Sequence, residues 1–118
     1  MAASTNSRVV IDTSVLFSFV FPDESTPPEI SKILHLAAKG KRILLAPTLL
    51  KYEIGNSIRS AIYQKRIDIL TAIDILDYIN KLKIYFLDPE SQKTLELSIK
   101  NGLTFYDASY LALSIEKN

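Results

Sequence analysis

The sequence predicts an α/β fold in which helices flank a short parallel sheet of about three strands. Short apolar runs alternate with longer segments of helical periodicity, which is typical of a parallel sheet with helical connections. The 118 residues suffice for one domain with its own core, but not for two. No internal repeat, low-complexity tract or linker divides the chain.

The short apolar runs are expected to form the strands, and the first of them ends directly before Asp12. The expected strands are 8–11, 43–46 and 84–87. Ligands of such sheets bind beyond the carboxyl ends of the strands. Asp12 is therefore expected at the edge of the sheet where a site would form.

The segments with apolar residues at helical spacing are expected to form helices. They are 14–21, 29–39, 47–66, 68–82, 89–100 and 104–117. Pro47 opens the longest, and Gly40 and Gly102 follow the ends of two others. The expected buried stripe of the longest helix is Leu50, Ile54, Ser57, Ile58 and Ala61. The expected buried stripe of helix 68–82 is Ile69, Ala72, Ile73, Leu76 and Ile79.

Composition excludes several classes of protein. Without cysteine the chain has no disulfide, no thiolate zinc site and no cysteine nucleophile. No apolar run approaches the ~18–20 residues of a membrane span, and the polar residues 1–7 predict a frayed or disordered tail rather than a signal peptide. These features predict a cytoplasmic protein. The net charge of +1 provides no strong basic field for nucleic acid, although it does not exclude RNA.

Three carboxylates, Asp12, Glu53 and Asp107, lie in apolar stretches of sequence, where an unpaired charge is costly to bury. If the fold brings them together, their like charges resist joint ionisation unless a cation offsets them. Mg²⁺ and Mn²⁺ prefer carboxylate and water ligands, and they can activate water for phosphodiester hydrolysis. The three acids therefore predict a metal-dependent nuclease.

Each acid also has a simpler explanation. Asp12 could cap the helix that follows it, and Asp107 could form a capping box with Thr104. Glu53 lies too far into its helix to be a cap, so a salt bridge to a lysine is its alternative role. These local roles stay open beside the metal-binding role.

Polar residues next to the acids are expected to position water or substrate. They are Thr13, Ser14, Asn56 and Thr104, and the hydroxyls among them could equally serve as helix caps. Aromatic residues could stack on unpaired bases, but their helical spacing beside Leu and Ile favours packing in the core. Those residues are Tyr52, Tyr63, Phe105, Tyr106 and Tyr110.

The three acids lie in motifs that resemble those of PIN-domain proteins, most closely the VapC-type toxin ribonucleases of prokaryotic toxin–antitoxin pairs. The matching segments are 10–16 (VIDTSVL), 46–56 (APTLLKYEIGN) and 103–113 (LTFYDASYLAL). Each motif is moderately specific, and their order along nearly the whole chain makes the resemblance strong.

The resemblance implies a three-layer PIN-like sandwich with Asp12, Glu53 and Asp107 around Mg²⁺ or Mn²⁺. It implies endonucleolytic cleavage of RNA, with a structured RNA such as tRNA as substrate. It further implies a homodimer and a small antitoxin protein that blocks the site.

The sequence departs from the family after the Asp107 helix. Family members usually continue into a strand with a T-x-D-like fourth acid and then a last strand, whereas this sequence stops at Asn118. The PIN-like domain, residues 8–118, is therefore expected to be truncated at its C-terminal end or completed by a partner, since the absent strands would lie beside the first strand and leave Asp12 at an uncovered edge.

Two other functions follow from these observations. A catalytically weak or inactive PIN-like module could bind RNA or a protein partner, because the fourth acid is missing. A small phosphatase or phosphotransferase could be built on Asp12, but the haloacid-dehalogenase-like pattern requires D-x-D after the first strand, and Ser14 occupies the second Asp position.

Overall fold

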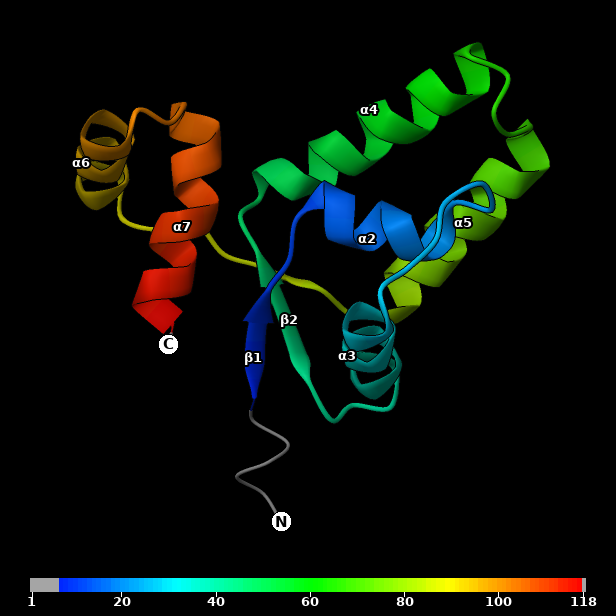
Figure 1. Ribbon diagram of the computed structural model, residues 1–118, viewed down its shortest axis with the longest axis horizontal. Coiled ribbons are helices and arrows are strands. Elements are labelled where there is room, and N and C mark those ends of the chain that lie inside the picture. The colour runs from blue at the N-terminus through cyan, green and yellow to red at the C-terminus, as the bar shows by residue number, and fades with distance from the viewer. Residues whose placement is uncertain (1–6, 118) are drawn as a thin grey trace.

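The computed structural model describes residues 7–117, and within them three strands and six helices form an α/β fold (Figure 1). The strands are β1 (Arg8–Val10), β2 (Ile43–Ala46) and β3 (Tyr85–Phe86). They form one parallel sheet in the order β1-β2-β3, with Val9 opposite Leu44 and Ala46 opposite Phe86. The predicted fold class is confirmed. The predicted frayed tail, apart from Ser7, lies outside the described residues.

Every predicted helix is present, and its ends differ from the expected ones by three residues or fewer. The helices are α2 (Thr13–Val20), α3 (Pro28–Ala38), α4 (Leu49–Tyr63), α5 (Ile69–Lys81), α6 (Ser91–Asn101) and α7 (Phe105–Lys117). Local signals explain several ends. Asp68 caps α5 by accepting a hydrogen bond from the Thr71 N–H at 2.8 Å. Gly102 ends α6 in the left-handed conformation, with φ +62°, which glycine adopts without steric cost.

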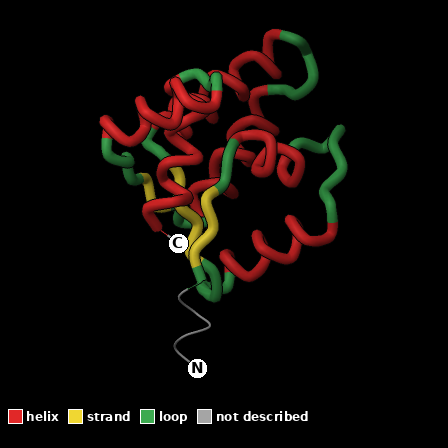
Figure 2. Tube along the Cα trace, turned by 60° about the vertical axis from the view of Figure 1, so that its left-hand side comes forward, coloured by secondary structure: helices red, strands yellow, loops and turns green. Residues whose placement is uncertain are grey.

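One face of the sheet covers the main core. Alternate strand residues, including Leu44 and Ala46, point toward buried side chains of α2, α3, α4 and α5. Leu16, Leu34 and Leu50 are fully buried there. Figure 1 shows these four helices on one side of the strands, with α6 and α7 on the other. Figure 2 shows from a second direction that the strands lie among the helices.

The opposite face of the sheet carries a second, smaller apolar cluster. Leu45 is buried on this face, and α7 contributes the buried Ala108, Ala112 and Leu113. Helix α7 contacts β1 and packs against α6. The helix pair α6–α7 therefore covers only part of this face, and Tyr85 at the edge strand remains 56% exposed. No helix in residues 7–117 combines the length and the apolarity that a bilayer crossing requires.

The predicted buried stripe of α5 is only partly correct. Ala72 and Ile79 are buried as expected, but Ile69, Ile73 and Leu76 are 63%, 49% and 39% exposed. Ile75 is buried instead. Helix α5 packs against α4. A single row of its side chains, at i, i+3 and i+7, is buried in the core: Ala72, Ile75 and Ile79. The remaining isoleucines lie on an open apolar surface between α4 and α5.

The core predicts a contrast between two leucines. Leu50→Ala should lower the free energy of unfolding by about 2–5 kcal/mol, because the side chain is 0% exposed and its removal leaves a cavity. Leu70→Ala is the matched control, since Leu70 is 71% exposed and should cost less than about 0.5 kcal/mol. Urea unfolding of both variants measures the difference. Equal losses in the free energy of unfolding for the two variants would contradict the burial of Leu50 in the core.

Candidate active site

Asp12 lies between β1 and α2, at the carboxyl end of the first strand. Its Oδ1 accepts hydrogen bonds from the Val15 N–H at 3.0 Å and from the Ser14 hydroxyl at 2.8 Å. Asp12 is therefore the N-cap of α2, as the simpler explanation anticipated. Its other oxygen, Oδ2, accepts no hydrogen bond from the described part of the chain, and the residue is exposed. The capping role leaves one oxygen available for a ligand.

Glu53 lies in the second turn of α4 and is half-buried. The Tyr110 hydroxyl donates a hydrogen bond to Glu53 Oε1 at 2.5 Å. The lysine salt bridge considered from the sequence is not formed, because the ion pairs within residues 7–117 involve Arg66 alone. A tyrosine from the last helix therefore orients the carboxylate of Glu53, and Oε2 remains free of partners in the described chain.

Asp107 lies in the first turn of α7 and is exposed. Its backbone N–H donates a hydrogen bond to Thr104 Oγ1 at 3.0 Å, so Thr104 caps this helix as predicted. The carboxylate itself has no hydrogen bond within residues 7–117, and its charge complements the positive end of the helix dipole. Both oxygens of Asp107 are therefore available.

Tyr110 connects the last helix to Glu53 through its hydroxyl. Burial raises the pKa of Tyr110 above its ordinary value, and the hydrogen bond to Glu53 and the negative charges of Glu53, Asp12 and Asp107 raise it further. Of the three acids, Glu53 alone makes a hydrogen bond with this hydroxyl, and Asp12 and Asp107 act on it only through their charges. The structure thus joins Glu53 to the helix that carries Asp107 and puts Asp12 at the carboxyl end of β1.

This role of Tyr110 was not predicted from the sequence. Its aromatic ring packs against the main core, as predicted, but its hydroxyl lies among the acids. The sequence did contain one indication of this role. Tyr110 follows Asp107 by three residues, so both side chains lie on one face of α7.

The core prediction was wrong for the other aromatic residues, because they project from helix faces that no described element covers. Their exposed fractions are 70% for Tyr52, 71% for Tyr63, 47% for Phe105 and 63% for Tyr106.

The chemistry of the three acids fits Mg²⁺ or Mn²⁺, because these hard cations take carboxylate oxygens and each acid keeps at least one oxygen free of described partners. In the arrangement of residues 7–117, no three His, Cys, Asp or Glu side chains are close enough to hold one ion together. Asp12 and Asp107 are exposed, and Glu53 is half-buried. The three acids therefore do not form a closed ligand set in this arrangement.

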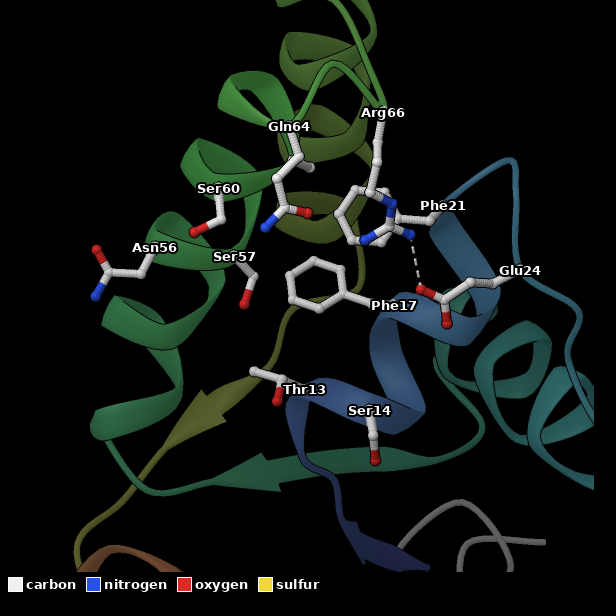
Figure 3. A pocket seen from close by; sticks show the side chains of 11 residues that line it. Thr13, Ser14, Phe17, Phe21, Glu24, Asn56, Ser57, Ser60, Gln64 and Arg66 are labelled. Atoms are coloured by element: carbon white, nitrogen blue, oxygen red, sulfur yellow. Dashed lines mark hydrogen bonds and ion pairs between the residues drawn. The ribbon is translucent and has the colours of Figure 1, made fainter.

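A groove of about 460 Å³ adjoins Asp12 and runs between α2 and α4. Its uncharged polar lining consists of Thr13, Ser14, Asn56, Ser57, Ser60 and Gln64, and Glu24 and Arg66 are its charged residues. Three of the four residues predicted to position water or substrate lie here, and Thr104 does not. Figure 3 shows Thr13 and Ser14 at one end of the groove and Gln64 and Arg66 at the other, with the Phe17 ring between them.

No family model matches this chain, and a search of curated proteins found no match. Among solved structures, the chain is similar to the crystal structure of PAE2754 from Pyrobaculum aerophilum, with a TM-score of 0.62 and 26% sequence identity. The alignment covers 90% of this chain and 65% of that chain, so this chain spans less than two thirds of the length of its neighbour. The likeness supports the α/β fold, and the activity has to be proposed from the site.

The raised pKa of Tyr110 predicts how stability depends on alkaline pH. The folded chain retains a phenolic proton that the unfolded chain loses above about pH 10. The contribution of Tyr110 to stability is therefore complete below pH 10 and is lost as the pH rises further. Tyr110→Phe should reduce the fall in the free energy of unfolding between pH 9 and pH 11.

Urea unfolding across this pH range measures the effect. Tyr52→Phe is the control, because it removes a hydroxyl from a tyrosine that is 70% exposed, and it should keep the wild-type pH dependence. The assignment is wrong if Tyr110→Phe and wild type lose stability in parallel.

Proposed function

We propose that the protein is a metal-dependent endoribonuclease of the PIN/VapC toxin type, which hydrolyses RNA phosphodiesters at the site of Asp12, Glu53 and Asp107. The observation that carries the proposal is the hydrogen bond that joins Glu53 to Tyr110, one turn after Asp107 on α7, while Asp12 lies at the carboxyl end of β1. The three acids come from the end of β1, the second turn of α4 and the first turn of α7. The sequence resemblance assigns the same three residues.

The free carboxylate oxygens of the three acids would hold Mg²⁺ or Mn²⁺. Such an ion activates water and stabilises the charge that develops on a phosphodiester. Tyr110 would act as a positioning residue, because its hydroxyl fixes one oxygen of Glu53 and leaves the other directed to the ion. Ser14 has the corresponding role for Asp12, whose Oδ1 it holds at 2.8 Å.

The groove between α2 and α4 would receive the substrate beside the acids. Thr13, Ser14 and Asn56 present hydroxyl and amide groups there, which can bind water or a sugar–phosphate backbone. Thr104 lies at the start of α7, where its hydroxyl oxygen receives the Asp107 N–H. Its remaining hydroxyl proton could hold a water next to that acid.

The proposal includes the partners that the resemblance implies: a structured RNA such as tRNA, a small antitoxin protein, and a second copy of the chain, in the cytoplasm. A protein partner would find an apolar surface between α4 and α5, where Ile69 and Ile73 are 63% and 49% exposed. Exposed apolar surfaces of this kind often mark protein–protein contacts.

A second candidate function is a catalytically weak or inactive PIN-like module that binds RNA or a protein. The observation that favours it is the open arrangement of the acids, since no three metal-ligating side chains in residues 7–117 are grouped closely enough to share an ion. Cleavage by purified protein separates the two functions.

The nuclease predicts that Asp12→Asn and Asp107→Asn each reduce the cleavage of a mixed pool of structured RNAs in Mn²⁺ or Mg²⁺ by about 100-fold or more, because each removes a charged ligand. Asn still caps helices, so Asp12→Asn should fold normally. Asp77→Asn on α5 is the control, because Asp77 is exposed and lies outside the groove and the acid cluster. Gel assays with and without chelator measure the rates, and circular dichroism checks the fold.

Two results would contradict the nuclease. Cleavage that survives in both variants would exclude the acids as its source. The absence of cleavage by folded wild-type protein in either metal would favour the binding module.

A further inference from the structure

The far end of the groove, away from the acids, has a surface that the proposed chemistry does not use. Ser57, Ser60 and Gln64 follow one another at i, i+3 and i+7 along α4, so they lie on one face of the helix. All three line the groove, and none of their side chains makes a hydrogen bond within the described part of the chain. Ser57 interrupts a stripe that is otherwise apolar and buried. These polar groups are therefore available to a ligand.

The charges at this end argue against a phosphate as that ligand. Arg66 is the one cation among the described residues that line the groove. Its Nε and Nη2 donate to the two oxygens of Asp23 at 2.9 and 2.7 Å, and Nη2 also donates to Glu24 at 3.0 Å. Two carboxylates thus more than offset the guanidinium charge. The net negative charge at this end would repel a phosphate, but it would not repel an uncharged group.

The same ion pairs fix the orientation of the planar guanidinium group of Arg66. The guanidinium lies 4.6 Å from the centre of the Phe21 ring, and the rings of Phe21 and Phe17 are stacked with centroids 4.7 Å apart. The rings are buried, but the Arg66 side chain is 32% exposed. Guanidinium planes are surfaces on which unpaired bases stack in RNA complexes. The groove therefore offers both a planar support and uncommitted donors and acceptors.

We infer that this end of the groove binds one unpaired nucleobase of the RNA substrate, which stacks on Arg66 while Ser57, Ser60 and Gln64 read its edge. Amide and hydroxyl side chains can both donate and accept, so they suit the hydrogen-bonding edge of a base. The inference rests on the proposed ribonuclease function, because the other end of the groove is lined by Thr13 and Ser14, which directly follow Asp12 in the sequence. With this subsite, the protein would recognise the identity of one unpaired base near the phosphodiester that it cleaves.

The test measures RNA binding separately from cleavage. The full chain in EDTA is titrated at one fixed salt concentration into fluorescent single-stranded octamers of A, C or U and into an RNA duplex, with anisotropy as the readout. Wild type should prefer one of the three octamers, and it should bind the duplex more weakly. Gln64→Ala should reduce the preference between octamers about tenfold, since one well-formed contact with a base edge discriminates by roughly that factor or more.

Matched variants make the result specific. Gln92→Ala on α6 removes the same side chain from an exposed helix outside the groove, and it should keep the wild-type preference. Ser60→Ala repeats the test at a second exposed position and should lower the preference in the same direction. Thermal unfolding of each variant checks that the fold is retained.

Three outcomes would overturn the subsite: equal binding of all octamers by wild type, a Gln64→Ala variant that keeps the preference, or a duplex bound as tightly as the best octamer. Because no metal is present, these outcomes do not depend on catalysis. A base preference without any RNA cleavage would support the base-binding subsite and contradict the ribonuclease function. RNA cleavage without a base preference would support the ribonuclease function and contradict the subsite.

Discussion

The hydrogen bond from Tyr110 to Glu53 joins the two parts of the molecule on which the candidate site depends. Glu53 belongs to α4, which is anchored in the main core, and Tyr110 belongs to α7, which packs on the other side of the sheet. The bond spans 57 positions of sequence. Asp107 lies one turn before Tyr110, so the contact that positions Glu53 also determines where Asp107 is placed.

The parallel sheet supplies the third acid through its geometry. All three strands run in the same direction, so their carboxyl ends lie along one edge, and Asp12 follows β1 at that edge. The N-cap bond then fixes one Asp12 oxygen and leaves the other exposed. Capping and metal binding were alternatives from the sequence, but the cap uses only Oδ1. The capping role is therefore compatible with the proposed metal site.

The two ends of the groove differ in their charged neighbours. One end is lined by Thr13 and Ser14 next to Asp12, whose Oδ2 has no hydrogen-bond partner in the described chain, and the proposed cation would bind there. At the other end Arg66 is held by Asp23 and Glu24, and the surface there presents neutral polar groups. With a net charge of +1, the proposed binding of RNA would depend on such local features rather than on a broad basic surface.

The sequence by itself determined the strands, the helices and the caps at Asp12 and Thr104, because these depend on residues within one or two turns. It also identified the three acids. Only the tertiary structure decided which face of α5 is buried, that Tyr110 meets Glu53, and that Arg66 is neutralised by Asp23, 43 positions away. Those outcomes depend on how helices pack across the sheet, and helical periodicity gives the spacing of a stripe without fixing what covers it.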